Sequence, residues 1–221
     1  MKAKLALGEG REYAGSKIHM ASNRLIVGIT GATGTIFGAR LLQALQTTEI
    51  ESHLVVSKWA ARTLLHETPY TLEQVQQMAT HNYPPGDQGA ALSSGSFMTR
   101  GMVIAPCSMR TLAAIAQGQG DNLIHRAADV VLKERRRLVL VAREAPLNDI
   151  HLENMLKLSR MGVTIMPPVP AFYNHPQTID DIINHIVVRI LDQFDIHLDG
   201  ARRWDGVMSV DGRRPETERI N

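Results

Sequence analysis

The sequence predicts an α/β fold: a Rossmann-like (flavodoxin-like), doubly wound parallel sheet with helices on both faces, in three αβα layers. Short, nearly continuous apolar runs alternate with longer segments of helical periodicity. This alternation is typical of parallel strands that are covered on both faces. The first apolar run, residues 25–29, leads into a glycine-rich turn and then a helical pattern. Repeated units of this kind connect with one hand and build a doubly wound sheet.

The individual elements follow from the same periodicity. The predicted strands are residues 25–29, 53–56, 102–106, 138–141 and 163–166. The predicted helices are residues 35–46, 58–67, 127–135, 150–160 and 180–194. Ser57 is a candidate N-cap for the second helix. The last helix has the clearest apolar stripe, which includes Ile183 and Ile186, and Thr178 with Asp181 has the spacing of a capping box.

Length and composition indicate one domain with polar ends. The chain has 221 residues, 44% of them hydrophobic, and a net charge of +2. We expect a disordered N-terminal extension over residues 1–22, one domain over residues 23–204 and a polar tail over residues 205–221. Met20 lies just before the first strand and is a candidate translation start.

Composition also bears on partners and location. The charge balance gives no indication of nucleic-acid binding, and no apolar stretch is long enough to cross a bilayer. The single cysteine, Cys107, excludes an internal disulfide and is typical of a reducing cytoplasm. The nine histidines show no metal-ligand spacing. The sequence therefore predicts a cytoplasmic protein without a metal.

The turn at residues 30–34 reads Thr-Gly-Ala-Thr-Gly. A glycine-rich turn between a strand and a helix exposes backbone N–H groups and the positive end of the helix to an anion. The third glycine is misplaced for the dinucleotide fingerprint, and no acidic residue follows at the usual distance. The turn therefore indicates the phosphate of a mononucleotide or flavin, and the alternative is an ordinary strand-to-helix turn.

Polar residues follow each of the other predicted strands as well. These residues are Ser57 and Lys58, the run from Ser108 to Thr111, Arg143 with Glu144, and a loop with four prolines that carries Tyr173. Because the carboxyl ends of parallel strands meet at one edge of a sheet, we expect these groups to converge on a pocket. The hydroxyls and cations suit a ligand that carries phosphate.

Several of these residues have two readings. Cys107 is either a nucleophile or a small buried residue, and the absence of a paired histidine in the sequence favours the second. Arg143 and Glu144 are either a ligand-binding and proton-transferring pair or a surface pair. Arg126, Lys133 and Arg189 either bind a ligand or are solvated cations on the surfaces of helices.

Nine segments together resemble the flavin prenyltransferases, the UbiX family, whose members are also named phenylacrylic or aromatic acid decarboxylases. The segments are TGATG at 30–34, SK at 57–58, SSGS at 93–96, PCS at 106–108, RAAD at 126–129, LKERR at 132–136, REAP at 143–146, HLENML at 151–156 and PAFY at 170–173. They run in order through the predicted domain. The Asn174-His175 pair that follows Tyr173 resembles the subset associated with hydroxyarylic acid decarboxylases.

The resemblance implies an FMN-binding flavoprotein domain that joins a dimethylallyl group to reduced FMN, at N5 and C6. The donor would be dimethylallyl monophosphate, and no metal would be required. The product, prenylated FMN, would serve a UbiD-type aromatic acid decarboxylase. The family forms homo-oligomers, often dodecamers built of trimers, with the sites at subunit contacts.

The resemblance also assigns roles to particular residues. The implied FMN contacts are Gly31, Ala32, Thr33, Ser57, Ser108, Met109, Arg110, Thr111 and Arg143. Tyr173 and Arg189 resemble the groups that hold the dimethylallyl phosphate, with Arg126 and Lys133 as further cations. Fixed cations stabilise a departing phosphate. Glu144 resembles the acid/base, and the implied catalytic set is Glu144, Lys133, Thr33 and Arg126. Threonine stands at position 33 where the family commonly has serine, so the hydroxyl is kept.

Two other functions remain open from the sequence. One is a non-catalytic FMN-binding subunit of a hydroxyarylic acid decarboxylase complex, although a mere flavin carrier needs no second phosphate site. The other is an FMN-dependent cysteine decarboxylase of related fold. Against it, the chain has no Pro-x-Met-Asn-x-x-Met-Trp-like segment and no obvious catalytic histidine after the first helix.

Overall fold

The computed structural model describes residues 22–200, 203, 204 and 206. Over these residues, six strands form one sheet in the order β3-β2-β1-β4-β5-β6, and every neighbouring pair is parallel. The strands are β1 (Arg24–Ile29), β2 (Glu51–Val56), β3 (His81–Tyr83), β4 (Gly101–Cys107), β5 (Arg137–Ala142) and β6 (Thr164–Ile165). The helices are α1 (Thr35–Leu45), α2 (Lys58–Glu67), α3 (Leu72–Met78), α4 (Met109–Ala116), α5 (Leu123–Lys133), α6 (Asp149–Arg160) and α7 (Ile179–Asp192), with a short 3-10 helix η1 (Ala91–Ser93).

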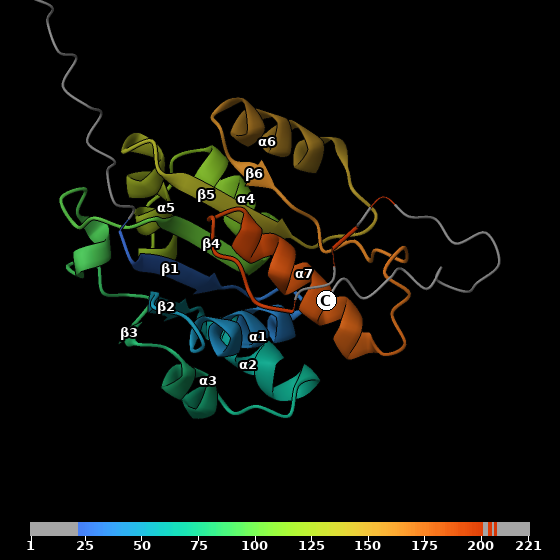
Figure 1. The fold of residues 1–221 in the computed structure, drawn as a ribbon. Coiled ribbons are helices and arrows are strands. Elements are labelled where there is room, and N and C mark those ends of the chain that lie inside the picture. The colour runs from blue at the N-terminus through green and yellow to red at the C-terminus, as the bar shows by residue number, and fades with distance from the viewer. Residues whose placement is uncertain (1–21, 201–202, 205, 207–221) are drawn as a thin grey trace, which may run out of the picture.

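Helices cover both faces of the sheet, so the predicted three-layer α/β fold is confirmed (Figure 1). Without β3, the order β2-β1-β4-β5-β6 is that of flavodoxin-like sheets, and β3 extends it to the order of dinucleotide-binding sheets. In both orders β2 lies on one side of β1, and β4 lies on its other side. The strand order therefore reverses between β1 and β4, and ligands of such sheets bind at this point.

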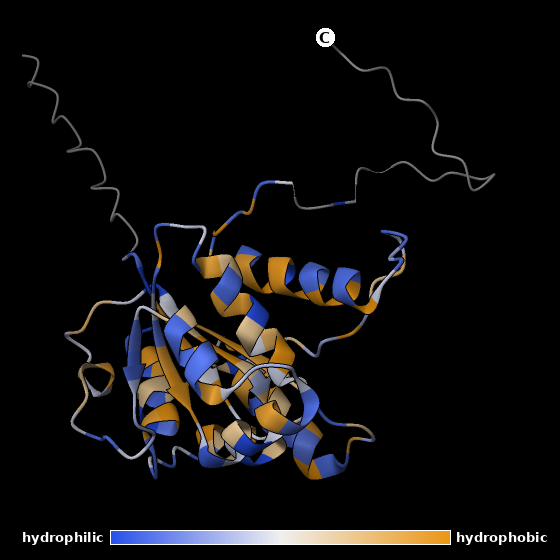
Figure 2. Cartoon of the chain, turned by 90° about the horizontal axis from the view of Figure 1, so that it is seen from below, coloured by the Kyte–Doolittle hydropathy of each residue, from blue (hydrophilic) through white to orange (hydrophobic). Residues whose placement is uncertain are grey.

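The core has two halves, one on each face of the sheet. Leu25 and Val27 of β1 pack with side chains of α1, α2, α3 and α7. Ile26 points to the other face and packs with side chains of α4, α5 and α6. This division follows from the alternation of side chains along a strand. Figure 2 shows strands largely in the hydrophobic colour, whereas the helices mix both colours. Each fully buried Leu, Ile or Val contributes about 1.5–3 kcal/mol to folding.

The structure corrects several predicted elements. The sequence patterns missed β3 because His81 and Asn82 are exposed polar residues on a strand of three residues. They also missed α3 and α4. The helix predicted over residues 127–135 is α5, which begins earlier because the Asn122 side chain accepts a hydrogen bond from the backbone N–H of His125. It ends at Lys133, and Arg135 takes a left-handed conformation with φ of 55°.

Thr30 joins the carboxyl ends of β1 and β4. Its backbone N–H and its hydroxyl both donate to the carbonyl of Pro106, at 3.2 and 2.9 Å. The same hydroxyl accepts from the backbone N–H of Ser108 at 2.8 Å. Because Thr30 is buried, these bonds are shielded from water and fix the two turns that follow β1 and β4 side by side.

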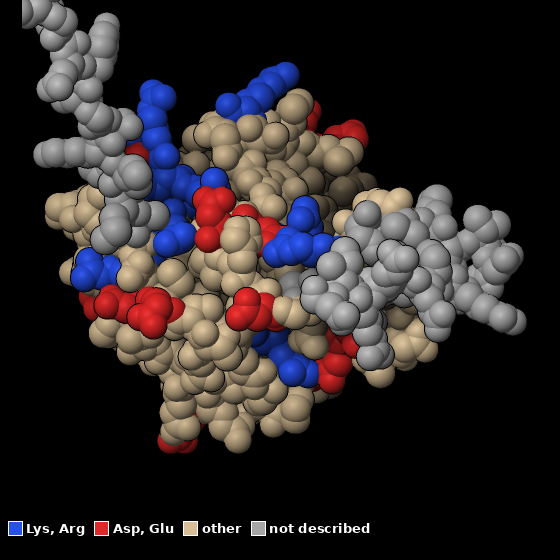
Figure 3. Space-filling view, viewed as in Figure 1, with Lys and Arg blue, Asp and Glu red and all other residues tan. Residues whose placement is uncertain are grey.

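The predicted extension and tail lie outside the described residues, apart from Ser22 and Gly206. Among the helices that the structure describes, none has the length and apolar character to span a membrane. Acidic and basic side chains are interspersed on the face of the molecule shown in Figure 3.

Candidate functional site

A pocket of about 670 Å³ opens where the strand order reverses. Its lining comes from five segments: the turn after β1, the loop after β3, and the starts of α2, α4 and α5. The residues that line it are Thr30, Gly31, Ser57, Lys58, Trp59, Pro85, Gly86, Ser108, Arg110, Thr111, Asp121, Asn122 and His125. Its volume is in the range of small-molecule and cofactor sites, about 300–1,000 Å³. The expected convergence of polar groups at this edge is therefore found for three of the five segments.

Of the three helix N-termini at this pocket, those of α2 and α4 begin with serine caps. The Ser57 side chain caps α2 by accepting from the backbone N–H of Ala60 at 3.1 Å. The Ser108 side chain caps α4 in the same way, accepting from the N–H of Thr111 at 3.3 Å, and its hydroxyl donates to the Thr111 hydroxyl at 3.2 Å. The remaining first-turn N–H groups of both helices have no partner within their own helix and carry partial positive charge. Together with the exposed guanidinium of Arg110, they suit a phosphate.

Gly31 is required by the close approach of α2. A Cβ atom built on Gly31 would lie 2.7 Å from the Cβ of Trp59 in the first turn of that helix. Such a contact would push the start of α2 away from the turn after β1. The glycine therefore brings Ser57 and Trp59 to the pocket wall.

The N-terminus of α1 is already occupied by a carboxylate of the chain itself. One oxygen of Glu67 accepts from the backbone N–H groups of Gly34 and Thr35 at 2.8 and 2.6 Å, and from the Thr35 hydroxyl at 2.6 Å. The other oxygen accepts from the Thr33 hydroxyl at 2.6 Å. The glycine-rich turn therefore does not offer the start of α1 to a phosphate, and this corrects the sequence prediction. The starts of α2 and α4, which line the pocket, are the remaining candidates for an anion site.

These contacts also determine the charge of Glu67. Burial alone would raise the pKa of this carboxyl, but the four hydrogen bonds favour the ionised form and leave the pKa below its usual value of 4.5. An acidic residue in the last turn of α2 is unfavourable for that helix, because it meets the negative end of the helix dipole. This misplacement is the one sequence signal that could have indicated a role for Glu67 elsewhere.

The structure divides the sequence-predicted site residues into groups. Gly31, Ser57, Ser108, Arg110 and Thr111 line the pocket. The Met109 side chain belongs to the core, so only its backbone is available there. Ala32, Thr33, Arg143 and Glu144 lie at the same sheet edge, outside the lining. Arg143 follows β5 and is held beside β4 by a bond from its N–H to the Cys107 carbonyl at 3.2 Å.

The cations of α5 do not line the pocket, although His125, next to Arg126, does. Arg126 pairs with Asp129 at 2.7 Å and donates to the Ser93 carbonyl at 3.2 Å. Lys133 pairs with Glu134 at the end of α5, four residues before β5 begins. Because β5 starts at the edge opposite to its carboxyl end, Lys133 lies toward the amino edge of the sheet.

Tyr173 and Arg189 form a further group near α7. The Tyr173 hydroxyl lies 3.3 Å from His185 Nε2, and the ring packs edge-on against Trp204. Arg189 pairs with Asp192 at 3.1 Å, and Asp192 also binds Arg203. Neither Tyr173 nor Arg189 lines the pocket, so one chain does not bring all the predicted site residues together.

Burial makes Cys107 a poor nucleophile at neutral pH. It is fully buried at the end of β4, and burial raises the pKa of its thiol well above the usual range. We expect that iodoacetamide does not alkylate Cys107 in the native protein at neutral pH, whereas the urea-unfolded chain reacts fully, as measured by intact mass. Alkylation of the native protein at a rate close to that of the unfolded chain would contradict this reading.

Comparison with known proteins identifies the family. The family model named Flavoprotein matches residues 14–191. A probable UbiX-like flavin prenyltransferase of Bacillus subtilis is 59% identical over 189 residues, which cover 86% of this chain and 93% of the relative. The chain belongs to the UbiX-like flavin prenyltransferases of the flavoprotein family. The resemblance inferred from the nine sequence segments is thus confirmed.

Two solved structures of this family agree with the fold. A dodecameric FMN-dependent UbiX-like decarboxylase from Escherichia coli O157:H7 is 59% identical, with a TM-score of 0.81 over 83% of this chain and 100% of that one. AnUbiX (PadA1), solved in complex with FMN and dimethylallyl pyrophosphate, is 51% identical, with a TM-score of 0.82 over 84% of this chain and 98% of that one.

Proposed function

We propose that this chain is a flavin prenyltransferase that joins a dimethylallyl group from dimethylallyl monophosphate to N5 and C6 of reduced FMN. The pocket between β1 and β4 carries this proposal, because two helix N-termini and the Arg110 guanidinium meet there in a space of cofactor size. Reduced FMN, when bound, supplies the electron-rich ring that accepts the prenyl carbons. The complex of a family member with FMN and dimethylallyl pyrophosphate supports FMN as the acceptor and a phosphorylated dimethylallyl donor here.

In this proposal the FMN phosphate binds at the starts of α2 and α4. Ser57 and Ser108 place the unpaired N–H groups of these helices toward the pocket, and Arg110 and Thr111 add a guanidinium and a hydroxyl. Gly31 completes the wall, and the backbones of Ala32 and Met109, which follow the lining residues Gly31 and Ser108 in the chain, lie next to it. The Trp59 side chain, which is 63% exposed, offers an aromatic surface beside the pocket.

The prenyl phosphate needs cations that one chain keeps outside this pocket. Arg126 and Lys133 on α5 and Arg189 on α7 are each paired with a carboxylate, and Tyr173 lies beside α7, with its hydroxyl 3.3 Å from His185. We propose that a homo-oligomer brings these residues from one copy to the pocket of another, in an assembly such as a dodecamer. The dodecameric relative supports this assembly. Three large apolar side chains near Tyr173, namely Val169, Phe172 and Ile179, are at least 70% exposed, and an interface would bury them.

The chemistry assigned to these residues is charge stabilisation and proton transfer. When the allylic C–O bond breaks, its electron pair leaves with the phosphate, and fixed cations stabilise that charge. Thr33, held by Glu67, and Glu144, which lies exposed after β5, are the proton-handling groups at this edge. We propose that the product serves a UbiD-type aromatic acid decarboxylase in the cytoplasm. The separate set of cations argues against a non-catalytic flavin carrier.

An anaerobic product assay tests this function. The purified chain is mixed with reduced FMN and, in parallel reactions, with dimethylallyl monophosphate or the pyrophosphate, and the released flavin is weighed by mass spectrometry. We expect a flavin that is heavier by one C5H8 unit with at least one donor. A parallel reaction with oxidised FMN is the control, because the acceptor ring must be electron-rich. Unchanged FMN with both donors would contradict the proposal.

A further inference from the structure

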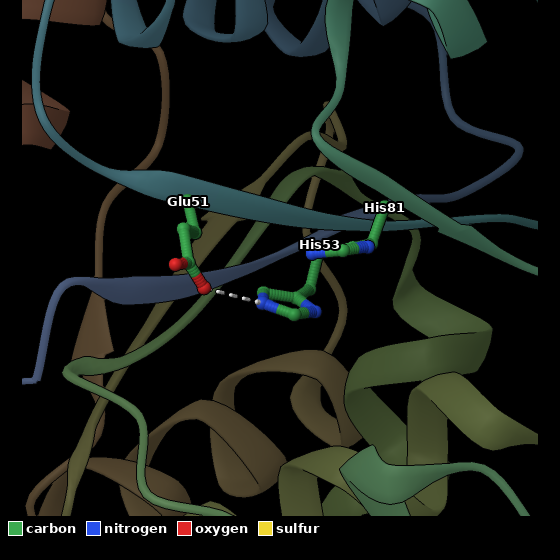
Figure 4. A group of neighbouring side chains, drawn as sticks. All are labelled: Glu51, His53 and His81. Carbon is green, nitrogen blue, oxygen red and sulfur yellow. Dashed lines mark ion pairs between the residues drawn. The ribbon is translucent and has the colours of Figure 1, made fainter.

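A second cluster of ligand-type side chains lies at the amino edge of the sheet, opposite to the flavin pocket. Glu51 is the first residue of β2 and His53 lies two residues further on, so both side chains point to the same face. His81 is the first residue of β3 and is the register partner of His53. Figure 4 shows the three side chains side by side. One ligand atom from each lies within 4.8 Å of the others.

His53 carries an unusual buried nitrogen. Its side chain is 3% exposed, and Nε2 has no hydrogen-bond partner. Nδ1 lies 3.0 Å from the Tyr83 hydroxyl. If Nδ1 holds the proton and donates to Tyr83, Nε2 presents a bare lone pair toward the Glu51 carboxylate, 3.9 Å away. Two electron-rich groups that face each other without a proton between them are unfavourable, unless a cation lies between them.

We propose that Glu51, His53 and His81 bind one divalent transition-metal ion of the Zn²⁺ class. His53 Nε2, a ring nitrogen of His81 and a carboxylate oxygen of Glu51 are the ligands, and water completes a four-coordinate shell. Two imidazoles select Zn²⁺ or Co²⁺ over Mg²⁺ and Ca²⁺, which prefer oxygen ligands. With Nδ1 protonated, its contact with the Tyr83 hydroxyl would orient His53 as a metal ligand.

Formation of the site requires two side chains to move. The His81 ring stacks on the His53 ring, with centroids 4.7 Å apart, and must turn so that its nitrogen faces the ion. The Arg24 guanidinium lies 3.1 Å from Glu51 and also packs over the Phe97 ring at 4.8 Å. Glu51, His81 and Arg24 all have solvent access, so these rotations do not disturb the core. Arg24 and the metal compete for one carboxylate.

A metal at this site would stabilise the β3 edge of the sheet. β3 has three residues and pairs only with β2 among the described strands. A metal held by both strands would tie this short edge strand to the rest of the sheet. The role is structural, because the site lies at the end of the strands away from the flavin pocket.

Metal titration of the full chain tests the proposal. The protein is purified without a histidine tag, stripped with a chelator and titrated with Zn²⁺ by calorimetry and with Co²⁺ by visible absorption. We expect one ion per chain and Co²⁺ bands of a four-coordinate site. His81→Ala and Glu51→Gln each should weaken binding by about tenfold or more, since each removes one ligand. Arg24→Gln should strengthen binding, because it removes the competitor.

The matched control is His66→Ala, which removes an exposed histidine on α2 and should leave binding unchanged. The variants at positions 51 and 81 alter exposed side chains, so folding is preserved and can be verified by circular dichroism. The proposal is wrong if the wild-type chain shows no saturable binding. It is equally wrong if His81→Ala and Glu51→Gln bind the metal as the His66→Ala control does.

Discussion

Replacing Lys133 by Met or Arg189 by Ala is expected to reduce prenyl transfer by about 100- to 1,000-fold while FMN stays bound. Loss of one fixed donor to a developing negative charge typically has an effect of this size. FMN binding should persist, because neither residue lines the pocket between β1 and β4. The measurement is the anaerobic transfer rate, together with fluorescence titration of FMN.

Lys157→Met is the matched control for these variants. Lys157 is an exposed lysine on α6 whose amine contacts only the Gln117 side chain among the described residues. We expect normal transfer and normal FMN affinity in this variant. If Lys133→Met or Arg189→Ala lost FMN and transfer to the same degree, the division into a flavin pocket and a prenyl-phosphate set would be refuted.

Replacing Glu67 by Gln is expected to slow prenyl transfer by about 100-fold, because the Thr33 hydroxyl loses the carboxylate that orients it for proton transfer. The same change removes an anion from the start of α1 and weakens four hydrogen bonds, at a cost in stability of about 1–2 kcal/mol at neutral pH. Transfer rates and urea unfolding measure the two effects. Glu153→Gln, an exposed change on α6, is the control.

The stability effect of Glu67→Gln should depend on pH. The folded-state pKa of Glu67 lies below the unfolded value of 4.5, so the folded protein keeps the carboxylate ionised after the unfolded chain begins to protonate. Its contribution is therefore fully present above that value and is lost as the pH falls through the lower, folded-state pKa. The stability difference between wild type and variant should shrink on acidification. A difference that stays constant down to acid unfolding would show that the ionised carboxylate is not what stabilises α1.

The sequence predicts those strands and helices whose buried side chains form a periodic apolar pattern. All residues of β4 and five of six in β5 are buried, and their continuous apolar runs identify them as strands covered on both faces. β3 leaves no such pattern because it is an edge strand with exposed polar side chains, fixed by its pairing with β2. The start of α5 depends on the cap at Asn122, which precedes the apolar stripe recognised in the sequence.

The sequence predicts those site residues that directly follow a strand. It misses those whose partners lie far away in the sequence. Ser57, Ser108 and Thr111 follow strands, so their position at the pocket follows from topology alone. Glu67 reaches Thr33 across 34 residues, and Glu51, His53 and His81 come from two strands with no local metal motif. The placement of Arg126, Lys133, Tyr173 and Arg189 away from the pocket becomes visible only in the folded chain.

We propose that each active site combines the flavin pocket of one chain with the cations of another. Co-expression of two inactive variants tests it directly. The Lys133→Met variant keeps an intact flavin pocket. The Arg110→Glu variant reverses the charge at the proposed binding site of the FMN phosphate but keeps Lys133. Mixed oligomers isolated through two different tags should regain about a quarter of wild-type transfer, because about one site in four would pair an intact pocket with an intact lysine. Mixed oligomers that stay as inactive as either parent would show that both residues act within one chain, and would contradict the account.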